Sequence, residues 1–539
     1  MLDLAKPAAC LDVLRKLHPV DAPSTHEMLS RMVRALLASP PAPNQHLEVL
    51  EAAREALDFC QHELSRRFIA NAARPGSEAD RHLQRVVALW LDMARSYAAL
   101  ASPQHGDDTL VDEVALLAQR RLHYAGRALF EYFRAHRAVP AGVWAEVHAG
   151  YVHARGRAVD GVRVSDLLNR TWRAQSACEA YIAVLLADLA NPYGRSGTEL
   201  NWILRWVERF APYCSLIADD GSASSGHYGI DPAADTGLRP LGSMPDRHGV
   251  LRFDGSILAT RMRAMLTQFK RGVAPAALGL GADCPPEAGS RLLLSLYRPW
   301  GRATAGRRFK RRAQHGSMEI TTEWAGIGLA ISGEVFHQPA TEIAPRPLRE
   351  DLHLMTFGEA VAEVDNGSHA QGRALREAQR LGLESAPWQL LDQSVGGFRI
   401  CRAADGETLS HRQLVGLRPA DGRHCLLGDT RWLMIRDDGT IEAGIEVLPG
   451  LPRVVAIRAA NHGSAGRPYQ QAFLLPGSSA LDTPASLVLP VRMFQPDRVI
   501  EVLEDGRSRK VTPVRVLRHG ANFDECEFAH DDGATVPAR

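Results

Sequence analysis

The sequence predicts a multidomain α+β protein, in which a helical N-terminal bundle precedes a β-barrel and a further C-terminal β segment. Three observations lead to this prediction. The 539 residues are too many for one hydrophobic core, since domains hold roughly 100–200 residues. Apolar residues follow a helical period over residues 45–216. Beyond Arg312 they alternate with a period of two between turn signals.

The N-terminal region, residues 1–218, is predicted to be a helical domain. From Leu47 to Phe68 and again after Val114, apolar side chains recur at three- to four-residue multiples, which is the spacing of one helix face. Pro and Gly interrupt this period at 101–103, 139–140 and 191–197. We therefore expect five or six packed helices. Four tryptophans are interpreted as core residues rather than as a ligand cage, namely Trp144, Trp172, Trp202 and Trp206.

Residues 219–305 are predicted to form a linker and a small α/β segment. The stretch 219–246 is rich in Gly, Ser, Asp and Pro and has no periodicity, which favours a linker. A short strand at 250–253 and two helices, at 256–269 and 287–297, are expected to follow it.

The remaining chain is predicted to contain a β-barrel with a helical insertion at 306–455 and a C-terminal β domain at 456–531. Its apolar segments are short, alternate with polar residues and are bounded by Gly, Pro or Asp. This pattern is typical of barrels and sandwiches. We expect the first strand at 317–331 and a helix at 357–381.

Composition and charge indicate a globular protein and restrict its partners. Hydrophobic residues make up 45% of the chain and charged residues 23%, which excludes a disordered or fibrous protein. Lys+Arg 63 against Asp+Glu 62 leaves a net charge of +1, so a polyanion would have to meet a local basic patch. Nucleic acid is therefore not the expected partner.

Cysteine usage and apolar runs indicate where the chain resides. The eight cysteines are scattered without metal-ligand spacing, so we expect free thiols in a reducing compartment. The N-terminus lacks a charged leader region, and no apolar run is long enough for a membrane span. The sequence thus predicts a cytoplasmic protein without membrane insertion.

Motifs of catalysis are sparse. The pair Gly279 and Gly281 lacks the third glycine of a dinucleotide-binding loop, and no strand leads into it. The sequence contains no Walker loop, no His-Glu-x-x-His and no Gly-x-Ser-x-Gly. We therefore expect a protein that is not an enzyme and that carries neither a cofactor nor a metal ion.

The first distinctive motif lies where the β half begins. Residues 306–312 read Gly-Arg-Arg-Phe-Lys-Arg-Arg and hold two interleaved Arg-x-x-x-Arg spacings, Arg307 with Arg311 and Arg308 with Arg312. Nearly all basic residues of this chain are arginine, so the spacing alone means little, but the density of cations is high. A solvated basic turn is the alternative interpretation.

The second motif is Asp-Gln-Ser-Val-Gly-Gly at 392–397, between two strand patterns. Asp392 and Ser394 leave a strand on the same side, and Gly397 allows a sharp bend or the close approach of a ligand. An ordinary turn between strands is the alternative, because Asp, Ser and Gly favour turns.

Together, in this order, the two motifs resemble the PilZ domain, the bacterial receptor module for cyclic di-GMP. In that family an arginine-rich segment precedes a six-stranded barrel that carries Asp/Asn-x-Ser-x-x-Gly. Residues 430–433 and 444–448 are similar to its penultimate strand and to a later Gly-hydrophobic-x-Phe/Val pattern. The whole chain resembles long proteobacterial proteins that join a helical N-terminal region to a PilZ-like barrel and a further β segment.

The resemblance implies a cyclic di-GMP site. Arg307, Arg308, Arg311 and Arg312 become candidates for contacts to phosphate and guanine. Asp392 and Ser394 would face the guanine edge, and Gly397 would admit the ligand to the barrel surface. The chemistry is consistent, since guanidinium groups bind phosphate through two parallel hydrogen bonds, pair with guanine O6 and N7, and stack on purines.

The spacing of the two motifs leaves two structural interpretations open. In most PilZ domains the arginines lie a few tens of residues before the Asp-x-Ser-x-x-Gly turn, whereas here the predicted helix 357–381 intervenes. Either a helical insertion follows the first strand, or the arginine cluster belongs to another element.

Three functions follow from these interpretations. The favoured one is a signalling adaptor, in which cyclic di-GMP binding at the barrel is coupled to an unidentified protein partner of the helical domain. The alternative is a degenerate PilZ scaffold or interaction module that binds no nucleotide. The third is nucleic-acid binding through 307–312, which the near-zero net charge and the lack of interleaved aromatic residues disfavour.

Overall fold

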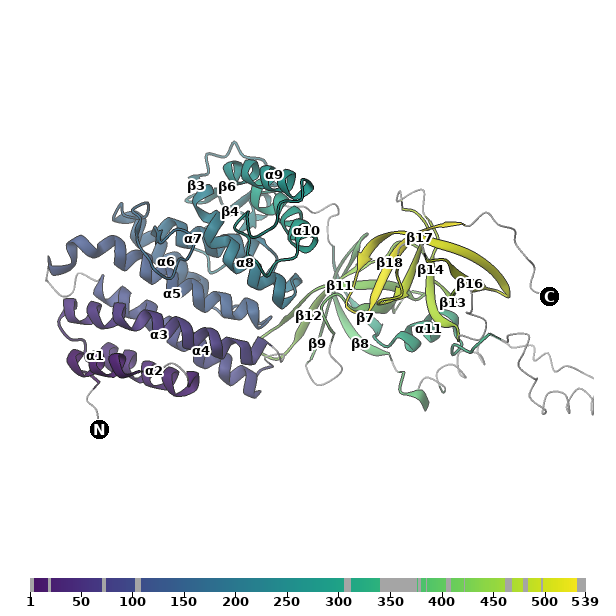
Figure 1. Ribbon diagram of the computed structural model, residues 1–539, viewed down its shortest axis with the longest axis horizontal. Coiled ribbons are helices and arrows are strands. Elements are labelled where there is room, and N and C mark those ends of the chain that lie inside the picture. Colours follow the sequence, from purple (N-terminus) through teal and green to yellow (C-terminus); the bar gives the residue numbers. More distant parts are fainter. Residues whose placement is uncertain are drawn as a thin grey trace, which may run out of the picture. The chain divides into compact units, whose positions relative to one another are not determined.

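The structure is a computed structural model of the chain (Figure 1). It describes residues 4–17, 21–69, 74–101, 108–304, 312–339, 376, 380–383, 385–403, 409–420, 422–460, 468–477, 483–495 and 498–530. The chain divides into two compact units. The first comprises Met1–Arg308 with Met434–Gly439, and the second comprises Phe309–Leu433 with Thr440–Arg539.

The first unit begins with a helical bundle. Its helices are α1 (Pro7–Lys16), α2 (Ala22–Ala38), α3 (Pro43–Ile69), α4 (Glu78–Leu100), α5 (Val114–Arg134), α6 (Val143–Gly156), α7 (Ala177–Leu189) and α8 (Gly197–Phe210). Helix α5 packs against α4, α6 and α7, and most of its residues are buried (Figure 1). Between α6 and α7 a small hairpin forms from β1 (Val164–Ser165) and β2 (Ala174–Gln175).

Local sequence signals explain several helix boundaries. Helices α7 and α8 each begin at a capping box, in which Ser176 with Glu179 and Ser196 with Glu199 satisfy each other's backbone N–H groups. Within the described parts of 43–210, helices α3 to α8 confirm the expected number. The prediction missed α1 and α2, which precede residue 45.

Most of the tryptophans that were expected in the core are buried. Trp144, Trp202 and Trp206 are at most 6% exposed, whereas Trp172 is only partly buried. The Trp172 indole donates a hydrogen bond to the Arg209 carbonyl, 3.3 Å away. Core packing therefore accounts for these side chains better than a ligand cage.

The first unit continues without a long linker. A four-stranded sheet with the order β3-β6-β4-β5 uses β3 (Ser215–Ala218), β4 (Tyr228–Ile230), β5 (Arg239–Pro240) and β6 (Leu251–Asp254). Helices α9 (Ser256–Lys270) and α10 (Pro286–Leu296) follow it. Strands β4 and β5 lie inside the stretch 219–246, so the absence of periodicity there reflects strands too short to display one.

The second unit contains two closed antiparallel barrels. The first has the order β10-β11-β12-β9-β8-β7 and the second the order β13-β14-β15-β18-β17-β16. The strands of the first are β7 (Arg312–Thr321), β8 (Ala386–Ser394), β9 (Gly397–Arg402), β10 (Leu414–Pro419), β11 (Leu426–Ile435) and β12 (Ile441–Val447). Those of the second are β13 (Arg453–Ala459), β14 (Gln470–Leu475), β15 (Ser486–Pro490), β16 (Ile500–Glu504), β17 (Arg507–His519) and β18 (Phe523–His530).

The predicted fold class is confirmed, because a helical region precedes two β regions. One element prediction is wrong. The strand expected at 317–331 ends at Thr321, and helix α11 (Trp324–Ser332) follows it. A short apolar run such as 324–332 fits a buried strand and a buried helix equally well, so periodicity could not decide between them.

Helix α11 lies between the two barrels of the second unit. The Trp324 indole donates to the Gln471 carbonyl at 3.0 Å, and the Gln471 amide donates back to the Trp324 carbonyl at 2.8 Å. Ile327 of α11 shares one hydrophobic cluster with Leu427 of the first barrel and Phe473 of the second. The barrels therefore pack around a common core. Within the described residues, no helix is long and apolar enough to cross a membrane.

Candidate functional site

The Asp-Gln-Ser-Val-Gly-Gly motif forms the hairpin that joins β8 to β9. Ser394 pairs with Gly397, and its hydroxyl donates a hydrogen bond to the Gly397 carbonyl at 3.3 Å. Val395, at the tip, is 74% exposed. The motif is thus an exposed two-residue turn at one end of the first barrel.

Gly397 is required by packing within the barrel. In the β9–β12 ladder it lies opposite Glu446, and a Cβ atom placed on it would collide with the Ile445 carbonyl. Gly444 of β12 is similarly enclosed, because the Trp432 ring occupies the space that a side chain would need. These glycines allow close approach of protein to protein, and the predicted role of Gly397 toward a ligand stays a prediction.

Three charged side chains from three adjacent strands meet beside this turn. Arg399 of β9 donates from Nε and Nη2 to Glu442 Oε2 of β12, at 3.1 and 3.0 Å. Its Nη1 lies 3.5 Å from Oδ2 of Asp392 on β8. The Glu442 side chain is 1% exposed, that of Asp392 15% and that of Arg399 35%. One guanidinium therefore links a buried carboxylate to a carboxylate at the surface.

The β7–β8 ladder also brings Arg312, the last residue of the arginine motif, to this turn. Arg312 is the first residue of β7, is exposed, and pairs with Gln393, while Ala313 lies opposite Asp392. The chain that carries the motif therefore enters the barrel next to Asp392, although a long stretch of sequence separates the two. Arg307, Arg308 and Arg311 lie outside the described residues. So does nearly all of the predicted helix 357–381.

Sequence reasoning missed Arg399, Glu442 and Trp432. Strand alternation after Gly397 could have indicated Arg399, because residues 397 and 399 of a strand share one face. Glu442 could not have been found in this way, since only the pairing of β9 with β12 brings it to Arg399.

This arrangement suits a ligand with hydrogen-bond donors on one edge and anionic groups on another. A carboxylate accepts two parallel N–H donors, and arginines bind phosphate through charge-assisted hydrogen bonds. Within the described residues, no group of three or more His, Cys, Asp or Glu side chains is placed to hold a metal ion.

Comparisons with known proteins match both ends of the chain to one family. The family model described as the N-terminal domain of the cyclic-di-GMP receptor FimW matches residues 8–220, and the FimW C-terminal β-barrel domain matches residues 455–530. Together they cover more than half of the chain. The chain belongs to the FimW family. The cyclic-di-GMP receptor FimW of Pseudomonas aeruginosa is 24% identical over 529 residues, which are 91% of this chain and 85% of that protein.

The FimW family assignment agrees with the structure on both sides of the first barrel. The N-terminal match covers helices α1 to α8, and the C-terminal match covers the second barrel. This confirms the predicted resemblance to long receptors that join a helical region to two successive β regions.

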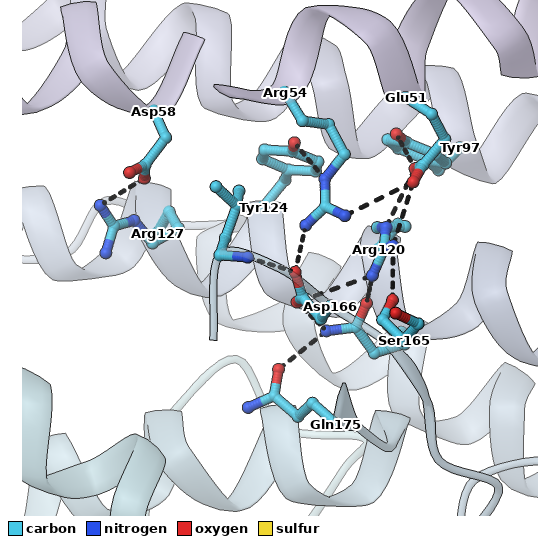
Figure 2. Close-up of polar contacts among 12 residues, drawn as sticks. Glu51, Arg54, Asp58, Tyr97, Arg120, Tyr124, Arg127, Ser165, Asp166 and Gln175 are labelled. Atoms are coloured by element: carbon cyan, nitrogen blue, oxygen red, sulfur yellow. Dashed lines mark hydrogen bonds and ion pairs between the residues drawn. The ribbon is translucent and has the colours of Figure 1, made fainter. Parts of the chain in front are cut away.

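The part that matches the FimW N-terminal domain contains a buried charged network (Figure 2). The buried side chain of Asp166, just after β1, accepts hydrogen bonds from Arg54 Nη2 at 2.8 Å and Gln119 Nε2 at 3.1 Å. Burial alone would raise the pKa of Asp166, but the positive charges of Arg54 and Arg120 outweigh burial and lower it. We attribute the lowering mainly to the arginines, because burial keeps His123 neutral.

Arg120 extends the network to α3 and to the β1–β2 hairpin (Figure 2). Its Nε and Nη2 each lie 3.0 Å from Glu51, and Nη2 also donates to the Ser165 carbonyl at 2.9 Å. Glu51 in turn accepts from the Tyr97 hydroxyl at 2.7 Å. Cations and anions in this cluster satisfy one another, so we interpret it as a clamp that fixes the hairpin on α3 and α5 rather than as a ligand site.

Proposed function

We propose that the chain is a signalling protein that binds cyclic di-GMP at the first barrel, which acts as a PilZ-type domain. The observation that carries the proposal is the β7–β8 register, in which Ala313 lies opposite Asp392. In this register Arg312, the last residue of the arginine motif, begins β7 beside the Asp-x-Ser-x-x-Gly turn, which supports a single site at this end of the barrel. The name of the Pseudomonas relative supports the same ligand.

The chemistry assigns a role to each motif. The guanine N1–H and 2-amino groups would donate to the Asp392 carboxylate, with the Ser394 hydroxyl beside it. The arginines of 307–312 would bind the two phosphates and stack on the purine faces. No catalytic group is needed for this function.

The coupling to an unidentified protein partner of the helical domain is the finer part of the proposal. The proposed ligand-binding residues belong to the first barrel, and the charged residues buried in the helical domain satisfy one another. The helical domain is therefore left for a role other than binding the nucleotide. A scaffold that binds no nucleotide is the alternative, and the following titration distinguishes the two.

The test is calorimetric titration of the full chain with cyclic di-GMP, comparing the parent with an Arg308→Ala, Arg312→Ala double variant. Loss of two charge-assisted contacts should weaken binding at least tenfold, which corresponds to about 1.4 kcal/mol. The matched control is Arg453→Ala with Arg515→Ala, which removes the same charge from exposed positions on the second barrel. Equal affinity in parent and test variant, or no binding by the parent, would contradict the proposal.

A further inference from the structure

We propose that Arg399 and Glu442 are positioning residues that aim the Asp392 carboxylate and thereby make the site selective for guanine over purines that lack a 2-amino group. The inference rests on the proposed function and goes beyond it, because it concerns how the ligand's base is distinguished. It does not require Arg399 to touch the ligand.

The Arg399 guanidinium is held in a fixed orientation by Glu442. Nε and Nη2 both donate to one oxygen of Glu442, and the Glu442 side chain is 1% exposed. A buried carboxylate on a barrel strand is fixed by its surroundings, so the guanidinium plane is fixed as well. The third nitrogen, Nη1, is then directed at Asp392.

The contact between Arg399 and Asp392 is longer than those between Arg399 and Glu442. At 3.5 Å it is an ion pair rather than a normal hydrogen bond. A carboxylate has about four lone-pair sites, so this contact orients Asp392 and leaves it capacity to accept ligand N–H groups.

The backbone around Asp392 supports the same role independently of these side-chain contacts. Both ladders of β8 are irregular next to Asp392, with a register shift between Leu390 and Asp392 toward β9, and another between Ala313 and Gly316 toward β7. Such β-bulges change the direction in which a side chain points and occur beside functional sites. After the first shift Asp392 lies directly opposite Arg399.

Selectivity for guanine follows from the donor pattern of the base. A correctly aimed carboxylate accepts from both guanine N1–H and the 2-amino group, whereas hypoxanthine offers only N1–H. A site built to hydrogen-bond a donor rejects the analogue that lacks it, because an acceptor that the bound base shields from water is then left unpaired. This discrimination requires accurate orientation of the carboxylate, which is what Arg399 and Glu442 would provide.

The experiment compares two ligands, cyclic di-GMP and its inosine analogue, which lacks the 2-amino groups. The full chain is titrated calorimetrically as the parent and as an Arg399→Met/Glu442→Gln double variant. Changing both residues avoids leaving the buried Glu442 charge without its cation, which could unfold the barrel. A second variant, Arg399→Lys, keeps the cation but cannot make the two-nitrogen contact. A thermal melt checks that each variant is folded.

We expect the parent to prefer cyclic di-GMP at least tenfold. In both variants this preference should fall to threefold or less, while affinity for the inosine analogue changes less than threefold. When Asp392 is first changed to Asn, adding the double variant should alter the preference for cyclic di-GMP over the inosine analogue less than twofold. The carboxylate that Arg399 and Glu442 position is then already absent.

Two results would overturn the inference, and they differ in what they say of the proposed function. If the parent binds cyclic di-GMP but the variants lose affinity for both ligands equally, Arg399 supports the fold or touches a shared part of the ligand, and only the positioning role fails. If the parent binds neither ligand, the proposed function fails and the inference fails with it.

Discussion

Gly397, which belongs to the predicted ligand-binding motif, is also required by the packing of the first barrel. The sequence places it in a turn between two strands, and the structure confirms that turn. What the sequence does not reveal is that its missing side chain lets the β9 and β12 backbones approach, with the Ile445 carbonyl where a Cβ atom would stand. Gly444 of β12 is enclosed differently, because the Trp432 ring of β11 occupies the space that a Cβ atom would need. Asp392 and Arg399 depend on this close approach for their alignment with Glu442.

Gly397→Ala should therefore destabilise the first barrel by about 1–3 kcal/mol, because backbone atoms must shift to admit the methyl group. Hydrogen exchange of the β9 and β12 amides measures the loss as a lower free energy of opening. Gly316→Ala on β7 is the matched control, since a Cβ there meets nothing within 4 Å. Similar exchange in both variants would show that this close contact does not govern stability.

At the scale of elements, the long periodic helices were predictable and the short elements were not. Helices α4, α5 and α8 each have one apolar face, and α4, α7 and α8 begin at a capping serine. By contrast, β4, β5 and α11 have too few residues for a period to develop. The small elements depend on tertiary contacts. One example joins three segments, where His148 of α6 lies between the Tyr181 hydroxyl of α7, 2.8 Å from Nδ1, and the Thr236 carbonyl, 3.1 Å from Nε2.

This contact predicts a pH dependence of stability. Burial lowers the pKa of His148, although the Thr236 hydrogen bond, Asp235 and Asp231 act in the opposite direction. The folded chain therefore holds His148 neutral, while the unfolded chain protonates it near the ordinary value of 6.5. Its contribution is complete above pH 6.5 and decreases as pH falls below that value, by at most about 1.4 kcal/mol per pH unit.

His148→Gln removes this titration while keeping one donor and one acceptor. Urea unfolding at pH 7 and pH 5.5 should accordingly show a smaller pH-dependent loss of stability in the variant than in the parent. His248→Gln changes an exposed histidine and serves as the control. An identical pH dependence in the parent and His148→Gln would contradict the prediction.

At the scale of the whole molecule, the second unit behaves as one body built from two barrels. Inside the second barrel, alternate residues such as Leu474 form its own core, while Phe473 and Leu475 point the other way, into the cluster with α11 and the first barrel. The apolar residues of β14 thus alternate between the core of the second barrel and the core that both barrels share. The proposed ligand turn lies on a barrel whose stability depends partly on its neighbour.

Phe473→Ala should loosen both barrels together. Removing a fully buried aromatic ring costs about 3–5 kcal/mol, and here the cavity would open in the shared core. Hydrogen exchange should accelerate in β7–β12 as well as in β13–β18. Val514→Ala, at a 61% exposed position of β17, should leave exchange unchanged. Faster exchange confined to the second barrel would contradict a shared core.

The sequence by itself determined the order of the regions, the helical period of the bundle, and the residues of the two motifs. These are local properties, because periodicity and turn chemistry act over a few neighbouring residues. Only the tertiary structure decided that Ala313 lies opposite Asp392, that Arg399 is held by Glu442, and that α11 joins the barrels. Those pairings bring together residues far apart in the chain, and closing such loops depends on the whole barrel rather than on any short segment.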